Sequence, residues 1–305
     1  MLNSISQNTL KQYNSVYKKW WEFSTNYNQN PFEYNLERVS DYLIELSEKD
    51  LSFSSVNTHK SALSFLFSFN PEDDKILKRI LKGVYNKKPP TPKYESTWDP
   101  SPVLDYLKKL HPLSSLNLTQ ITLKLTMLLA LTTGHRVQTF SSIQLENIKF
   151  LQDKIEIKIS GKLKTSGKNK YQPLIILPFF AECPELCVAT VLQFYIEKTK
   201  ELRPSNEQFL LITYKKPYHR ATSQSVSRWL KTTLQESGID TNTFSGYSTR
   251  HASTSAAYRK GINIETIRKT AGWTHASETF NKFYNKPITQ NSDAFARAVL
   301  NLNKK

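Results

Sequence analysis

The sequence is poor in cysteine, and its two cysteines, Cys183 and Cys187, stand four residues apart in ECPELC. On a helix this spacing could let the thiols touch. A tetrahedral zinc site needs a second Cys or His pair, however, and none lies nearby in the chain. We therefore interpret both residues as reduced thiols of an intracellular protein, and we expect no metal at this position.

Long apolar runs and cofactor motifs are missing as well. No run reaches the roughly 18 residues that a membrane-spanning helix requires, and the first residues, MLNSISQNTLKQYN, lack the pattern of a signal peptide. The sequence has no Walker loop, no HExxH helix and no DxD cluster to indicate an ATPase, a zinc protease or a metal nuclease. We expect a protein with no cofactor and no membrane partner.

Acidic residues are scarce relative to basic ones, with 26 Asp and Glu against 42 Lys and Arg and a net charge of +16. Residues 1–93 carry 13 basic and 10 acidic residues, whereas residues 94–305 carry 29 and 16. A soluble protein needs only a few net charges, so this excess indicates a polyanionic partner. The second part of the chain is the stronger candidate for contacting a phosphate backbone.

Apolar residues recur at helical spacing in the first part of the chain. The fourth helix begins with Pro and acidic residues, which match the dipole at a helix N-terminus, and it is expected to end at Gly83. The predicted helices span residues 6–26, 36–48, 53–69 and 71–84. We predict a helical domain over residues 1–88 and, because four prolines cluster after it, an interdomain linker over 89–101.

The rest of the chain, residues 102–305, is predicted to be mainly α with a small antiparallel β-sheet, and it ends in a tail from about residue 286. Isoleucines alternate with charged residues at 155, 157 and 159, and an apolar run follows at 174–177, which indicates strands. Gly134 is expected to cap the end of a buried helix. The helical patterns cover residues 103–110, 119–134, 138–145, 185–202, 223–238 and parts of 248–284.

Four short motifs in this second domain contain residues suited to phosphate chemistry. They are TTGHRVQTF with Arg136, KTSGK with Lys164, GYSTRHAS with Arg250, and RKTAGW…FNKFYNKP with Tyr284. An arginine guanidinium offers planar, paired donors to phosphate oxygens and stays charged at physiological pH. A tyrosine phenol can attack phosphorus and hold a broken strand as a covalent ester.

These motifs resemble the tyrosine recombinase (phage integrase) family. Their residue sequences look most like its eukaryotic mobile-element branch, the Crypton and DIRS-type recombinases. The resemblance covers the chain from about residue 98 onward. By helix count alone it extends to the family's N-terminal core-binding, SAM-like domain. It implies a site-specific DNA recombinase that cleaves and rejoins strands through a 3′-phosphotyrosine without a metal or cofactor, in the integration or excision of a transposable element.

The resemblance also implies roles for single residues. Arg136 and Arg250 match the family's two arginines, which would neutralise the pentacoordinate transition state. Lys164 matches the lysine of a mobile hairpin and would protonate the departing 5′ oxygen. Because lysines crowd this segment, Lys162 and Lys168 remain alternatives for that role.

Trp273 matches the family's His/Trp position, where an indole N–H could donate to a phosphate oxygen, although a core tryptophan is the alternative. Tyr284 matches the nucleophile, with Tyr258 as its rival. Trp273 and Tyr284 are 11 residues apart, whereas phage and bacterial members mostly use about nine. The helix of the nucleophile is therefore expected to start late or to contain a small bulge.

Tyr247 stands where the family most often has His, three residues before the second arginine. Tyrosine can donate a hydrogen bond to phosphate but is a poor base at neutral pH. His251 occupies a second position at which the family often has His, and helix packing is its simplest interpretation. His275 could point toward the site, although a surface position is the simpler expectation.

The resemblance implies double-stranded DNA as the partner, bound by a homo-oligomer that is a dimer on one site and a tetramer on a Holliday junction in synapsis. The C-terminal tail would dock on a neighbouring subunit. We expect a nuclear location for a eukaryotic mobile element, and otherwise the nucleoid or cytoplasm. The alternatives are a catalytically silent DNA-binding protein, a type IB topoisomerase-like relaxing enzyme and a telomere-resolving enzyme.

Overall fold

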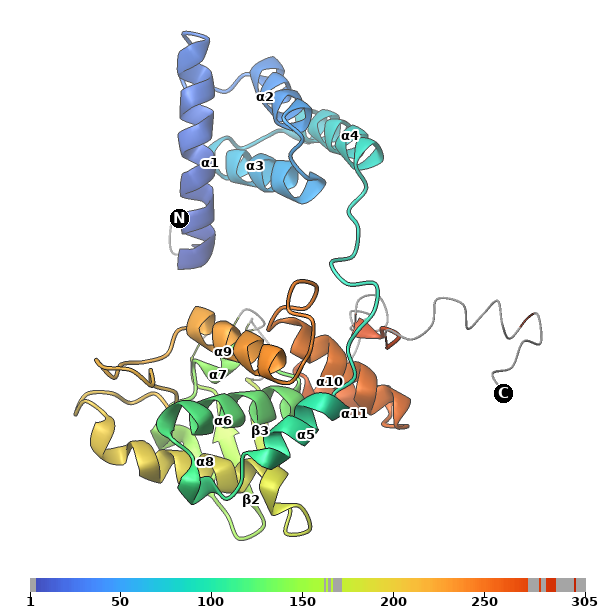
Figure 1. Ribbon diagram of the computed structural model, residues 1–305. Helices are drawn as coiled ribbons and strands as arrows, with labels where there is room; N and C mark the ends of the chain where they lie inside the picture. The colour runs from blue at the N-terminus through green and yellow to red at the C-terminus, as the bar shows by residue number, and fades with distance from the viewer. Residues whose placement is uncertain are drawn as a thin grey trace. The chain divides into compact units, whose positions relative to one another are not determined.

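The computed structural model (Figure 1) describes residues 4–161, 163, 166, 172–273, 280, 284–288 and 299. The chain divides into two compact units, Met1–Lys93 and Tyr94–Lys305. The predicted mainly helical fold with one small antiparallel sheet is confirmed. Within the described part of the chain, none of the helices has the length and apolar character that crossing a membrane requires.

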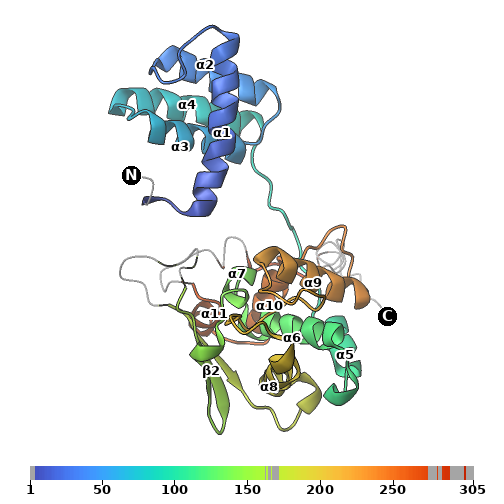
Figure 2. The same ribbon diagram turned by 90° about the vertical axis from the view of Figure 1, so that its left-hand side faces the viewer.

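The first unit consists of four helices around one apolar core (Figure 2). The core is centred on Trp20, whose ring packs against the rings of Phe23, Tyr42 and Phe67. Each helix has a Ser or Asn side chain that caps its N-terminus, in agreement with the cap signals in the sequence. The helices are α1 (Gln7–Asn26), α2 (Leu36–Glu48), α3 (Phe53–Leu66) and α4 (Pro71–Lys87).

Two predicted helix ends in this unit are wrong. Helix α3 ends at Leu66 because Phe67 adopts an extended backbone and buries its ring in the core. Helix α4 continues past Gly83 to Lys87, because Val84 is buried against the same core. Burial of one apolar side chain thus outweighs the cost of about 1 kcal/mol for a glycine inside a helix.

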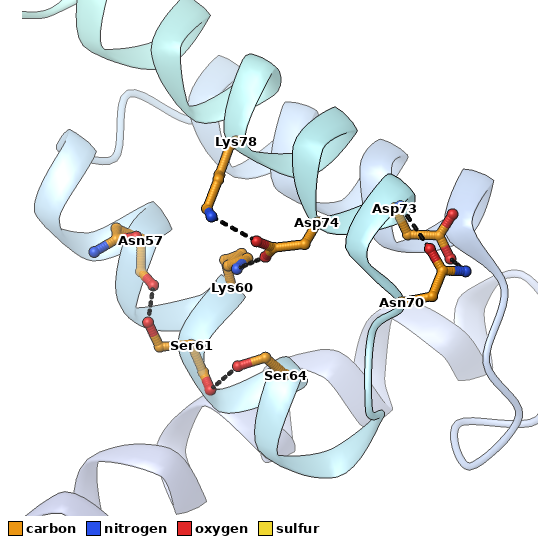
Figure 3. Close-up of polar contacts among 8 residues, drawn as sticks. All are labelled: Asn57, Lys60, Ser61, Ser64, Asn70, Asp73, Asp74 and Lys78. Carbon is orange, nitrogen blue, oxygen red and sulfur yellow. Dashed lines mark hydrogen bonds and ion pairs between the residues drawn. The ribbon is translucent and has the colours of Figure 1, made fainter.

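Polar side chains on α3 and α4 satisfy one another (Figure 3). The Asp74 carboxylate accepts hydrogen bonds from Lys60 of α3 and, at 2.7 Å, from Lys78 one turn along α4. At the start of α4, the Asn70 side chain accepts from the Asp73 N–H at 2.8 Å. The charges in this part of the first unit are therefore paired within the unit itself.

The second unit is built around α6, which is almost entirely buried and packs against α8, α9 and α10. As predicted, Gly134 ends this helix in the left-handed conformation, with φ of 59°. The helices of the unit are α5 (Ser101–Lys109), α6 (Leu118–Thr133), α7 (Val137–Phe140), α8 (Val188–Thr199), α9 (Ser223–Glu236), α10 (Ser248–Arg259) and α11 (Ile264–Thr270).

The sheet has three antiparallel strands in the order β1-β2-β3 and contacts α8 (Figure 2). Strands β2 (Lys154–Lys158) and β3 (Leu174–Pro178) lie where the alternation predicted them, with Ile155 opposite Leu177. Strand β1 (Ile148–Phe150) was not predicted, because three residues are too few to establish a period of two.

The boundary between the units falls after Lys93, so residues 94–101, which we expected in the linker, belong to the second unit. The reason is that two aromatic side chains of this segment, Tyr94 and Trp98, are each only 4% exposed and join the core of the second unit. Prolines made the whole segment resemble a linker, but they do not prevent an extended segment from packing.

Candidate active site

Arg250 lies in the first turn of α10 and is only 3% exposed. Its Nη1 donates a hydrogen bond to the carbonyl of Gly134, the residue that ends α6. The left-handed backbone of Gly134 turns that carbonyl away from the intrahelical hydrogen bonds of α6. The contact fixes the guanidinium at the junction between the end of α6 and the start of α10.

Two aromatic rings face the Arg250 guanidinium. Its Cζ lies 4.1 Å from the centre of the Trp273 ring and 5.4 Å from that of the Tyr284 ring. The two rings meet edge to face, with centroids 4.9 Å apart and an angle of 63°. Cation–π contacts of this kind therefore bring together three residues that are up to 34 positions apart in the sequence.

Arg136 lines the same small pocket as Arg250, Tyr247 and Thr249. It is the residue immediately before the single turn of α7, and its backbone is extended, with φ of −77° and ψ of 149°. The two guanidinium groups are close enough that the charge of Arg136 helps to lower the pKa of Arg250. Because two guanidinium cations line this pocket, its chemistry suits the binding of an anion.

The Tyr284 phenol is 4% exposed and shares a hydrogen bond with the hydroxyl of Tyr247, which is 42% exposed. On its other side, the imidazole of His251 is stacked on the Tyr284 ring, with centroids 4.2 Å apart and an angle of 15°. Because these rings are nearly parallel, the His251 nitrogens lie over the Tyr284 ring face. The Tyr284 hydroxyl therefore contacts Tyr247, and the Arg250 side chain is its second polar neighbour.

The backbone around Tyr284 is also held in place. Ser255 of α10 donates its hydroxyl to the Tyr284 carbonyl and accepts the N–H of Lys286 at 3.1 Å. The Asn285 N–H donates to the carbonyl of Phe280 at 2.8 Å, five residues earlier. A five-residue hydrogen bond is the π-type arrangement that adds one residue to a helical turn, and such turns are frequent at functional sites.

Burial and neighbouring charges shift the pKa values of the site. Burial, together with the neighbouring charge of Arg136, lowers the pKa of Arg250 to about 10. Burial lowers the pKa of His135 to about 3, with the two arginines acting in the same direction. Burial and the hydrogen bond to Tyr284 raise the pKa of Tyr247 to about 12. At neutral pH the site therefore holds a neutral imidazole and a neutral Tyr247 phenol beside two cationic groups.

Several buried donors of the site have no acceptor. Among the residues that the structure describes, none accepts a hydrogen bond from Arg250 Nε or Nη2, from Trp273 Nε1 or from the Thr249 hydroxyl. A buried donor without a partner costs about 1–3 kcal/mol, and more when it is charged. Thr249 and Arg250 line the pocket that Arg136 also lines, and the Trp273 ring lies against the Arg250 guanidinium. A single oxyanion could therefore satisfy more than one of these donors.

Five of the six residues that the motifs singled out meet at this place: Arg136, Tyr247, Arg250, Trp273 and Tyr284. The sixth, Lys164, lies outside the described residues, as do its alternatives Lys162 and Lys168 and the histidine at 275. The rival tyrosine, Tyr258, lies two turns beyond Arg250 on α10 and packs edge-on against Phe280.

From the sequence we missed two further residues of the site, Ser255 and His135. Ser255 follows Arg250 by five residues, and nothing in its surroundings distinguishes it from the other small polar residues of α10. His135 was detectable, since it immediately precedes Arg136. Gly272, with φ of +68°, approaches its ring so closely that an added Cβ would lie 2.9 Å from Cε1.

The site has no evident metal ligands. Across the described ranges, His, Cys, Asp and Glu residues do not gather in any group of three or more that could hold a metal ion. The hydrogen-bonding groups that face the pocket are instead cations and neutral donors, which suit an anion.

Comparison with known proteins extends these observations. The family model described as "Phage integrase family" matches residues 104–290. No curated protein matches the chain in sequence.

Three solved structures are similar in fold. XerH site-specific recombinase in a pre-cleavage complex with difH substrate gives a TM-score of 0.60 at 15% identity, over 89% of this chain and 71% of that one. The Tn1549 transposon integrase with circular intermediate DNA gives 0.57 at 17%, over 88% and 85%. A lambda integrase tetramer bound to a Holliday junction gives 0.54 at 16%, over 95% and 74%.

Proposed function

We propose that this chain, which belongs to the phage integrase family, cuts and rejoins DNA strands at specific sites through a covalent link to Tyr284. One observation carries the proposal: the Trp273 and Tyr284 rings face the Arg250 guanidinium, and buried donors of Arg250 and Trp273 have no acceptor among the described residues. A phosphodiester would supply the missing acceptors and would place its phosphorus within reach of a nucleophile.

The first chemical step would form one bond and break another at that phosphorus. The Tyr284 oxygen attacks and forms a 3′-phosphotyrosine, while the bond to the 5′ oxygen breaks. Arg136 and Arg250 stabilise the additional negative charge of the pentacoordinate transition state. The 5′ hydroxyl of another strand then reverses the step, so the bond energy is conserved and no cofactor or metal is required.

Two protons must move in this step. The departing 5′ oxygen takes up one, for which the family resemblance offers Lys164 as the acid. The Tyr284 phenol loses the other. Tyr247 is in contact with that hydroxyl and is partly exposed, so it can receive the Tyr284 proton as it passes its own to water. This relay lets a neutral phenol assist the nucleophile without acting as a strong base.

We propose double-stranded DNA as the substrate and a homo-oligomer as the active form. The concentration of positive charge in residues 94–305 supports the first part. Lambda integrase, which has a similar fold, has been solved as a tetramer bound to a Holliday junction, and this supports the second. A contribution of the C-terminal tail to the contacts between subunits is part of the same proposal.

We further propose that the chain serves a mobile element of the Crypton or DIRS type and acts in the nucleus. The residue sequences of the motifs around Arg136, Arg250 and Tyr284 support this assignment. Expression of the tagged chain in eukaryotic cells, followed by fractionation, tests the location. Exclusion of the protein from nuclei would contradict it.

A nicked suicide substrate, on which the cleaved strand loses a short fragment and cannot be religated, tests the reaction itself. The parent protein should accumulate a covalent DNA adduct, and Tyr284→Phe should bind the same DNA without forming one. Tyr258→Phe is the matched control and should form the adduct at the parental rate. Binding without any adduct from the parent would favour a catalytically silent DNA-binding protein.

A further inference from the structure

A short segment at the start of the second unit, residues 94–98, contacts the beginning of α10 through both of its buried aromatic side chains. The Tyr94 hydroxyl lies 2.6 Å from the Ser245 hydroxyl, and its ring meets the His251 ring edge to face at 5.4 Å. The Trp98 Nε1 donates to the Ser248 hydroxyl at 2.9 Å. Tyr247 lies between these two serines in the sequence.

The same segment also holds the chain that follows Tyr284. The Thr97 N–H donates to the carbonyl of Pro287 at 2.8 Å, and Thr97 pairs with Ile288 as a parallel β-bridge. Arg259 of α10 donates to the next carbonyl back, that of Lys286, at 2.7 Å. The residues just beyond the phenol are thus held by α10 on one side and by residue 97 on the other.

We propose that residues 94–98 form a strap that positions the nucleophile, with Tyr94, Thr97 and Trp98 as positioning residues. The inference rests on the proposed function of Tyr284. Tyr94 and Trp98 fix the start of α10, which carries Tyr247 and Arg250. The backbone of Thr97 fixes the segment that follows Tyr284, so one short stretch of chain sets the distance between the arginine and the phenol.

The strap matters because catalysis depends on sub-ångström placement. A misplacement of about 1 Å at the reacting atoms can cost about 10²-fold in rate. The backbone of Tyr284 and of the residues after it is held by Ser255, Arg259 and Thr97. The strap also follows Lys93 directly, where the first unit ends. Tension in the connection would therefore reach the strap before any other part of the second unit.

Proline at position 97 isolates this contact, because proline has no N–H to donate to Pro287. Alanine at the same position keeps the N–H and serves as the matched control. In the full chain, we expect Thr97→Pro to lower the single-turnover rate of adduct formation at saturating DNA by about tenfold or more. We expect its Kd for an unnicked site to change less than about twofold, and Thr97→Ala to keep the parental rate within about twofold.

A second variant covers the case in which Thr97→Pro does not fold. Trp98→Phe keeps the buried ring and removes only the donor to Ser248, so we expect a fold that melts within a few degrees of the parent and a rate reduced by about tenfold. Parental cleavage rates in Trp98→Phe, or in a folded Thr97→Pro, would contradict the proposal that the strap positions the nucleophile. An equal fall in DNA affinity and cleavage would overturn it too. Absence of any adduct from the parent would instead contradict the proposed function.

Discussion

The two units use their charged side chains in opposite ways. In the first unit five ion pairs join lysines to carboxylates, and Asp74 lies between two of those lysines (Figure 3). In the second unit, Arg136 and Arg250 form no ion pair with any residue that the structure describes, although Arg250 is buried. The second unit has ion pairs as well, of Lys108 with Asp105 and of Lys154 with Glu156. Its two site arginines differ in having no carboxylate partner among the described residues.

This difference is unfavourable for the stability of the second unit. An exposed ion pair adds about 0–1 kcal/mol, and a well-packed apolar side chain would serve a core better than a buried guanidinium with open donors. A ligand that binds the folded site would recover the loss. The contrast is what we expect of a unit whose site is completed by a bound phosphodiester, in keeping with the proposed function.

The largest expected effect comes from exchanging a charge within the site. Arg250→Lys keeps the charge but cannot both reach the Gly134 carbonyl and present paired donors to phosphate. We expect adduct formation to slow by about 10²–10³-fold. Lys78→Ala in the first unit removes an exposed, internally paired charge and should leave that rate unchanged. Similar rate losses in both variants, measured by single-turnover trapping, would erase the contrast.

The hydroxyl of Tyr247 should contribute less. Tyr247→Phe removes the hydrogen bond to Tyr284, worth about 1–1.5 kcal/mol, so we expect about a tenfold slower cleavage step. Since the pKa of Tyr247 is raised to about 12, the cleavage rate should show no ionisation of this residue between pH 6 and pH 9. Tyr247→His restores a proton-transfer group and should recover most of the rate. No recovery would argue that position 247 only packs.

Substitution of one glycine in each unit tests the comparison through the free energy of unfolding. Gly272 has φ of +68° and no room beside His135, so Gly272→Ala should destabilise the second unit by about 2–3 kcal/mol. Gly83 lies inside α4 with nothing within 4 Å of an added Cβ, so Gly83→Ala should stabilise the first unit by about 0.5–1 kcal/mol. Denaturant titration of each variant measures the change in its free energy of unfolding. Changes of the same sign in the two variants would contradict the account.

Acid should weaken each unit through a buried histidine whose pKa is lowered, His59 in the first unit and His135 in the second. Burial lowers the pKa of His59 to about 4 and that of His135 to about 3, from 6.5 in the unfolded chain. As pH falls below 6.5 the unfolded chain binds protons that the folded chain does not. Stability is therefore complete above pH 6.5 and is lost progressively toward pH 4 and pH 3.

Substitution of His59 tests this most simply. His59→Gln should remove about 1 kcal/mol of the acid-induced loss at pH 5.5, relative to pH 7.5, from the unfolding of the first unit. The parental pH dependence in His59→Gln would show that another group is responsible.

Much of this arrangement could be predicted from the sequence, because short-range signals determine it. Helical periodicity and Ser or Asn caps located the four helices of the first unit, and Gly134 located the end of α6. The motifs also selected Arg136, Arg250, Trp273 and Tyr284, which the fold brings together. Their side-chain types alone are informative, since few functions need two arginines, an indole and a phenol in this order.

The remaining features depend on contacts between distant parts of the chain. Tyr94 and Trp98 follow a cluster of prolines. Only the fold reveals that they form hydrogen bonds with the serines at 245 and 248. The length of α4 likewise depends on the burial of Val84 in a core formed by three other helices. Composition and periodicity carry no information about such partners.

The most direct test of the central claim is to identify the residue that becomes attached to DNA. The adduct trapped on a nicked substrate would be digested with nuclease and protease, and the modified peptide would be sequenced by mass spectrometry. The account predicts a nucleotide remnant on Tyr284 of the parent protein and no remnant on Tyr284→Phe. A remnant on Tyr247, Tyr258 or any other side chain would contradict it.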